Sequence, residues 1–147
     1  MSKEKFQTVV KGLITNRGEL LIGKKEETEG HPISGKWHLL GGHLEHGEQV
    51  EEAIEREVEE ETSLEVEVHQ TVDVMTFPWD GDEKDSLQIV FHCEADSKDA
   101  EALDDLTEVK WVEPSELADF VHSEEAERLE GREEQARFLE KIEKAPF

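Results

Sequence analysis

The chain contains no tyrosine, a single cysteine, few basic side chains and no long apolar run. Because Cys93 is alone, an internal disulfide is excluded, and its strand-like surroundings (QIVFHCEA) indicate simple burial. None of the apolar runs is long enough to span a bilayer, and the first residues (MSKEKFQ) lack the apolar core of a signal peptide. We therefore expect a cytoplasmic protein without a membrane partner.

Basic residues are scarce: 16 lysines and arginines face 39 acidic residues, which gives a net charge of −23. A surface this acidic repels the phosphates of nucleic acids, so nucleic acid is excluded as a partner. The charge is more than one active site needs, and a salty cytoplasm is one explanation. The 147 residues contain no repeat or low-complexity linker, so we expect residues 1–147 to form a single domain.

Hydrophobic periodicity predicts both strands and helices. Strands are expected at residues 6–15, 20–24, 37–40, 64–77, 87–95 and 109–112. Residues 26–36 are polar and contain glycine and proline, so they form a loop. Helices are expected at residues 49–63, in the segment EPSELADF, and from Ser123 to about Glu143. Strands with helices on both sides predict an α/β fold, with a mixed β-sheet in an α/β/α sandwich.

The helix expected at residues 49–63 carries glutamates on two faces. Its apolar positions recur at helical spacing: Val50, Ala53, Ile54 and Val58. With the first of these at zero on a helical wheel, the apolar arc runs from roughly −60° to +80°. Glu57 and Glu61 fall inside it at about −20° and +20°, and Glu60 lies at its edge, at about −80°. The remaining glutamates fall well outside the arc: Glu51, Glu52, Glu55 and Glu59.

Carboxylates on a buried face must be neutralised. Burying an unpaired carboxylate is costly, and acids four residues apart repel each other. Either protons or cations can remove this cost, and Arg56 alone cannot neutralise three acids. Clustered carboxylate oxygens are the ligands that Mg²⁺ prefers. A solvated acidic surface helix is the alternative, but it does not explain the inward-facing acids, so we interpret Glu57, Glu60 and Glu61 as a metal site.

Glycines precede this helix at Gly41, Gly42 and Gly47. Glycine permits backbone conformations and close approaches that other residues resist. We therefore expect a sharply turning loop that brings main-chain carbonyls or amides against an ion or a phosphate.

Together these residues resemble the signature of the Nudix hydrolases, G-x5-E-x7-R-E-Φ-x-E-E-x-G-Φ, where Φ is aliphatic. The matching positions are Gly42, Glu48, Arg56, Glu57, Val58, Glu60, Glu61 and Leu64. Ser63 stands where the family has glycine, a residue that eases the exit from the helix. The resemblance implies the Nudix-type α/β/α sandwich with a mixed β-sheet.

The resemblance also implies the chemistry: Mg²⁺-dependent hydrolysis of the pyrophosphate linkage of a nucleoside diphosphate derivative, with Mn²⁺ able to substitute. Divalent ions neutralise a polyphosphate and activate water. The implied metal ligands are the carbonyl of Gly41 and the carboxylates of Glu57, Glu60 and Glu61. The alternative function is a non-catalytic nucleotide-binding sensor on the same fold, which the intact acidic residues disfavour.

The implied substrate is a small nucleotide: a nucleoside triphosphate, ADP-ribose or a nucleotide sugar. Diadenosine polyphosphates are disfavoured, since that branch of the family often uses a tyrosine beyond the motif and this chain has none. A homodimer is left open.

Several further residues are candidates for the site. Arg56 either orients a glutamate through a charge-assisted pair or makes an ordinary surface ion pair. Glu48 either supports a ligand or is an acid at the helix N-terminus. The resemblance leaves the general base open, since different branches of the family use a glutamate of the motif, here Glu57 or Glu60, or an acid from a distant loop. Glu108 is the candidate for that distant acid, because its segment, EVKWVEPSEL, resembles the one that carries the acid in the nucleoside triphosphatase branch of the family; a solvated glutamate is the alternative.

Aromatic side chains are candidates for stacking on the base of the substrate: Trp37, Phe77 and Trp79. For the last two, an exposed hairpin tip stiffened by Pro78 is an equal alternative.

Overall fold

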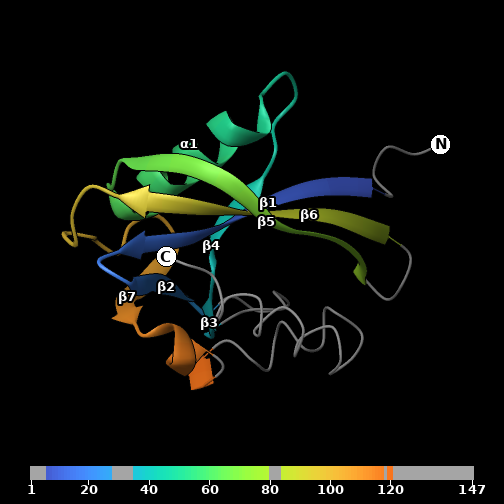
Figure 1. The fold of residues 1–147 in the computed structure, drawn as a ribbon. Coiled ribbons are helices and arrows are strands. Elements are labelled where there is room, and N and C mark those ends of the chain that lie inside the picture. Colours follow the sequence, from blue (N-terminus) through green and yellow to red (C-terminus); the bar gives the residue numbers. More distant parts are fainter. Residues whose placement is uncertain (1–5, 28–34, 80–83, 118, 121–147) are drawn as a thin grey trace.

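The computed structural model describes residues 6–27, 35–79, 84–117 and 119–120, and the side chains of residues 77–79 and 84 lie outside that description. One seven-stranded sheet dominates the fold (Figure 1). Its strands are β1 (Phe6–Asn16), β2 (Glu19–Lys25), β3 (Trp37–His38), β4 (Leu40–His43), β5 (Val66–Trp79), β6 (Lys84–Ala95) and β7 (Leu106–Val112).

The sheet is mixed, with the order β3-β2-β1-β6-β5, while β4 pairs with β1 and β7 pairs with β2. β1 and β6 are parallel, and the other pairs are antiparallel. β1 is the central strand because it pairs with three others, and its near-continuous apolar run suits burial on both faces. The predicted α/β fold with a mixed sheet is confirmed.

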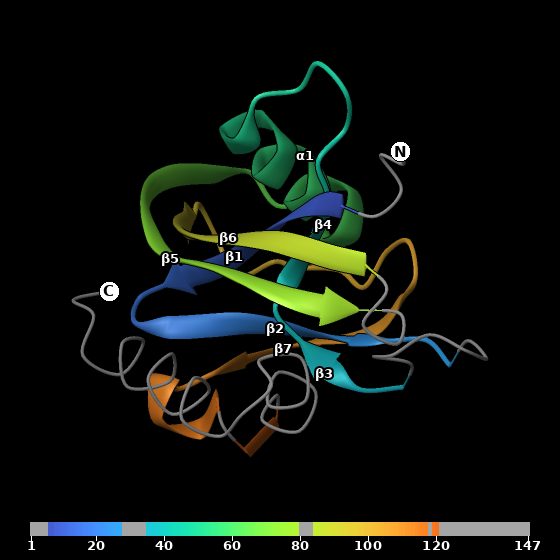
Figure 2. The same cartoon turned by 90° about the vertical axis from the view of Figure 1, so that its right-hand side faces the viewer.

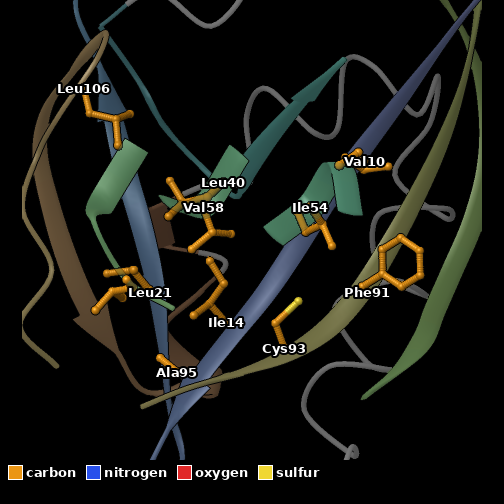
Figure 3. Close-up of a cluster of buried hydrophobic side chains, with 12 residues drawn as sticks. Val10, Ile14, Leu21, Leu40, Ile54, Val58, Phe91, Cys93, Ala95 and Leu106 are labelled. Carbon is orange, nitrogen blue, oxygen red and sulfur yellow. The ribbon is translucent and has the colours of Figure 1, made fainter. Parts of the chain in front are cut away.

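One helix, α1 (Val50–Thr62), covers one face of the sheet (Figure 2). It begins with a capping box, in which the side chains of Gln49 and Glu52 bond each other's backbone amides. Ile54 and Val58 pack among residues of β1 and β6, including Ile14 (Figure 3). In the described part of the chain, no helix is long and apolar enough to cross a membrane.

A second apolar cluster lies away from α1 and includes Leu13, Leu20, Val90 and Leu117. The predicted burial of Cys93 is confirmed, and that burial raises the pKa of its thiol to about 12.

The expected glycine loop is in fact a strand. Gly41 pairs with Lys11 across β4 and β1, and its φ of +150° is a conformation that favours glycine. A Cβ at Gly41 would lie 2.0 Å from the carbonyl oxygen of Val10. The prediction of a sharp loop at Gly41 and Gly42 was therefore wrong: both lie in β4, where Gly41 allows a close approach to β1 and Gly42 leaves room for the carboxylate of Glu57. Gly47 does adopt a positive φ, +82°, in the turn that follows.

Other element boundaries differ by a few residues. The last strand begins at Leu106 instead of residue 109, and the expected helix after it begins as a 3₁₀ turn, η2 (Pro114–Glu116). The helix expected from Ser123 to about Glu143 lies outside the described residues, and so does the second helical layer that depends on it.

α1 ends at Ser63 in the left-handed conformation, with φ 69° and ψ 5°, and the Ser63 amide donates to the carbonyl of Glu59 at 2.9 Å. The helix thus ends in the left-handed conformation that glycine usually adopts at this position, although the residue here is Ser63. A side chain in this conformation costs about 1 kcal/mol.

Ser63→Gly should therefore raise the free energy of unfolding by about 0.5–1 kcal/mol, slightly offset by the greater freedom of glycine in the unfolded chain. Urea unfolding measures the change. Ser115→Gly, inside η2, is the control and should be destabilising by a similar amount. A loss of stability in Ser63→Gly would contradict this account of the helix exit.

Candidate active site

The faces of α1 separate its glutamates as the helical wheel predicts. Glu61 is buried, with 5% of its surface exposed, and the side chain of Glu57 is 15% exposed. The side chain of Glu60, at the edge of the apolar arc, is 53% exposed. The four glutamates expected in water are all exposed: Glu51, Glu52, Glu55 and Glu59. The prediction that two acids point inward is confirmed.

Glu61 lies against the glycine strand. The Gly41 amide donates to Oε1 of Glu61 at 3.0 Å. Burial raises the pKa of Glu61 to about 7, and the negative charge of Glu57 adds to that rise. The Lys11 ammonium opposes the rise; this lysine is itself buried, and its Nζ donates to the carbonyl of Leu39 at 3.2 Å. Glu61 is therefore poised between the protonated and ionised forms near neutral pH.

The carboxylate of Glu57 lies against the backbone of Gly42. A Cβ at Gly42 would lie 2.5 Å from the carboxyl carbon of Glu57, so any side chain at Gly42 would displace that carboxylate. Burial raises the pKa of Glu57, and Arg56 opposes that shift. The absence of a side chain at Gly42 is what creates the space for Glu57.

Arg56 links the acidic residues. Its Nε and Nη2 donate to the two carboxylate oxygens of Glu48 at 2.7 and 3.1 Å, a bidentate pair. Its Nη1 donates to Oε1 of Glu57 and to Oε1 of Glu60, both at 3.1 Å. The hydrogen bond between Arg56 and Glu48 lowers the pKa of Glu48, and it is also the largest contribution to the raised pKa of Arg56. Arg56 therefore orients three glutamates, and Glu48 fixes Arg56.

These residues suit a hard divalent cation chemically. The donors are all oxygens, and the space above Gly42 is filled by a carboxylate that burial makes costly to ionise. Among the residues that the structure describes, however, no group of three acidic, histidine or cysteine side chains is gathered closely enough to form a metal site. The two acids nearest the glycines hold other partners, since Arg56 binds Glu57 and Gly41 binds Glu61.

Asp104 is a further acid close enough to act on Glu57 and Glu61, and the sequence does not single it out. The segment before β7 docks on the end of α1, where the Leu103 amide donates to the carbonyl of Glu61 at 2.9 Å. Asp104 follows with a φ of +56°, and its charge raises the pKa of both Glu57 and Glu61. In the sequence, Asp104 looks like any acid of a solvated run, and the only signal is its place just before a strand.

Comparison with known proteins decides the family. A family model described as the NUDIX domain matches residues 5–141. The chain belongs to the Nudix hydrolase family. It is a pyrophosphohydrolase, and enzymes of this family act on small nucleotides and generally use divalent cations.

Similar proteins include nucleoside triphosphatase NudI of Salmonella agona (strain SL483), 32% identical over 122 residues that cover 76% of this chain and 85% of that protein. NudI of Escherichia coli O81 (strain ED1a) is 28% identical over 123 residues, or 78% of this chain and 86% of that protein. Among solved structures, the MutT protein of Methanosarcina mazei Go1 has a TM-score of 0.76 at 24% identity, covering 97% of this chain and 96% of that one.

Other predicted residues of this Nudix hydrolase contact different partners or have side chains outside the described residues. Glu108 is exposed on β7, where its carboxylate lies 3.6 Å from the Lys24 ammonium. Trp37 packs edge-on against Phe120, with ring centroids 5.9 Å apart. Phe77 and Trp79 belong to β5, but their side chains lie outside the described residues. Their substrate-binding roles, and the role of Glu108, stay predictions.

The raised pKa of Glu61 predicts how the stability of this Nudix hydrolase depends on pH in chelator. The folded pKa, about 7, lies above the ordinary value of 4.5, so the folded state holds its proton more tightly than the unfolded chain. The stabilisation is full below about pH 4.5 and is lost as pH rises through 7. Glu61→Gln should reduce the loss of stability between pH 5 and pH 8 by on the order of 2 kcal/mol.

Urea unfolding at the two pH values measures this difference. Glu59→Gln, an exposed position on the same helix, is the control and should keep the pH dependence of the natural protein. If Glu61→Gln and Glu59→Gln behave alike, Glu61 does not carry the shifted titration.

Proposed function

We propose that this enzyme hydrolyses the pyrophosphate linkage of a nucleoside triphosphate, with Mg²⁺ as its cofactor and Mn²⁺ able to substitute. The observation that carries the proposal is the inward pair Glu57 and Glu61, held against Gly42 and Gly41, where burial raises the pKa of both carboxyls although Arg56 and Lys11 oppose that rise. The relatives named nucleoside triphosphatase support a triphosphate over ADP-ribose or a nucleotide sugar. The proposed location is the cytoplasm, and the proposed unit is a single domain.

The residues that would hold the metal are Glu57, Glu60 and Glu61 through their carboxylates, and Gly41 through its carbonyl. When bound, the cation supplies neutralisation of the polyphosphate and a lowered pKa of water. Arg56, fixed by Glu48, keeps Glu57 and Glu60 in place before any ligand arrives.

The substrate class is tested with one panel of nucleoside triphosphates, ADP-ribose and nucleotide sugars, with products identified in Mg²⁺ and in chelator. We expect turnover of at least one triphosphate, abolished by chelator and restored by Mg²⁺ or Mn²⁺. Turnover that survives exhaustive chelation would refute the metal role. A preference for ADP-ribose or a nucleotide sugar would replace the triphosphate as substrate.

The inward glutamates should matter far more than the outward ones. Glu→Gln keeps size and removes charge, so at Glu57, Glu60 or Glu61 it should lower turnover on the order of 10²-fold or more. The same change at the outward positions should leave turnover within a few-fold and stability within about 0.5 kcal/mol. Those control positions are Glu51, Glu52, Glu55 and Glu59.

The seven variants are compared for turnover, and for the rise in melting temperature that Mg²⁺ produces. Equal losses of turnover in both sets, or an unchanged Mg²⁺ effect in the inward variants, would place the ion elsewhere on the acidic surface.

Asp104 and Glu108 are the two candidates for the distant acid, and one pair of variants separates them. Asp104→Asn should lower turnover by on the order of tenfold or more, because its charge already acts on Glu57 and Glu61. Glu108→Gln should stay within a few-fold if its ion pair with Lys24 is its whole role. The opposite ranking would assign the distant acid to Glu108.

A further inference from the structure

The face of the sheet turned away from α1 carries a row of four residues that includes a buried glutamine. A Cβ at Gly12 would lie 3.3 Å from Cδ1 of Ile54, so the even-numbered positions of β1 face the helix and the odd-numbered positions face away. Residues paired in register point to the same side, and the register aligns four of them across β4, β1, β6 and β5. These are His43, Val9, Gln88 and Met75.

Gln88 is the anomaly in this row. Only 1% of its surface is exposed, and its Nε2 donates to the sulfur of Met75 at 3.9 Å, a weak acceptor. Its Oε1 has no hydrogen-bond partner among the described residues. Leaving a buried amide oxygen unpaired costs about 1–3 kcal/mol, which methionine or leucine at this position would avoid. The cost is explained if a ligand supplies the missing donor.

Further polar residues accompany Gln88 on this face. Ser86, fully buried and two residues away on β6, accepts a hydrogen bond from Nε2 of Gln7 at 2.9 Å. In the neighbouring row the register aligns Gly41, Lys11, Val90 and Asp73, and both charged members are buried. A face that served only as core would not concentrate so many buried polar groups.

The row ends on β4, the strand that also contacts the acid cluster. Gln88 lies two strands from β4, about 10 Å at the usual spacing between strands. β4 carries Gly41, whose amide binds Glu61. His43, at that end of the row, is exposed, whereas Gln88, farther along the row, is buried. A nucleotide with its phosphates at the glycine strand would therefore extend its base along the row toward Gln88.

We propose that Gln88 reads the base of the substrate, with its Oε1 accepting a hydrogen bond from an exocyclic amino group. This inference rests on the proposed function and narrows it to nucleotides whose base carries such a group. Nε2 is turned to Met75, so the free atom of the amide is the acceptor. Adenine and cytosine present an amino group where their deaminated counterparts present a carbonyl oxygen, which would face Oε1 without a proton between them.

The experiment compares two matched substrate pairs, ATP with ITP and CTP with UTP, by kcat/KM. In the natural protein, the amino-bearing member of at least one pair should be preferred about tenfold or more. In Gln88→Met that preference should fall to within about threefold of equality, while the melting temperature without nucleotide rises because the unpaired amide is gone. A purely structural glutamine would give no change in the preference.

The controls separate this inference from the proposed function. Gln70→Met, at an exposed position of β5, should change neither the preference nor the stability, and Gln88→Leu serves as a second apolar variant. Calorimetric binding of AMP and IMP gives the same comparison without hydrolysis. Failure to hydrolyse any triphosphate would refute the proposed function, while AMP and IMP would still test Gln88. Equal use or binding within every pair, a carbonyl preference, or a preference kept in both apolar variants would overturn the role of Gln88.

Discussion

The contact between the acidic face of α1 and the glycine strand β4 is the constraint on which the rest of the site depends. Glu57 occupies the space that a side chain at Gly42 would fill, and Glu61 accepts from the amide of Gly41. Neither contact survives if β4 carries side chains or if α1 turns on its axis. The pairing of Gly41 with Lys11 on β1, and the burial of Ile54 on the same helix, set those two positions. The contacts that pack the core therefore also fix the positions of the two acids.

That contact creates an electrostatic problem, which the chain resolves by giving its carboxylates different environments. Glu48 is stabilised as an anion by the bidentate pair with Arg56, which lowers its pKa. Glu61 is buried deeply enough that its pKa rises to about 7. Glu57 lies between these extremes, raised by burial and lowered by Arg56. A cation that replaced the proton at Glu61 would meet oxygens that are already oriented. Burial of like charges can in this way favour the binding of a cation.

The sequence predicts correctly those residue positions that follow from hydrophobic periodicity. It does not predict positions that depend on how distant segments pack together. The inward position of Glu57 and Glu61 follows from a period of 3.6 residues and is confirmed by their burial. Gly41 was misplaced because a glycine signals a turn as readily as a close strand contact, and only the pairing with β1 distinguishes them. Asp104 went unrecognised because it reaches the site through a segment that docks on the end of α1. No local pattern encodes that docking.

The odd-numbered face of β1 has an apolar half and a polar half. Toward one end, Leu13 joins Val90 and Leu117 in an apolar cluster that satisfies the ordinary rule for a buried face. Farther along, the same face carries Lys11 and, beside Val9, the unsatisfied amide of Gln88. Stability alone would extend the apolar cluster along the whole strand. The polar half lies where β4 pairs with β1 and where Gly41 binds Glu61. The departure from an apolar core therefore occurs on the strands next to the acid cluster.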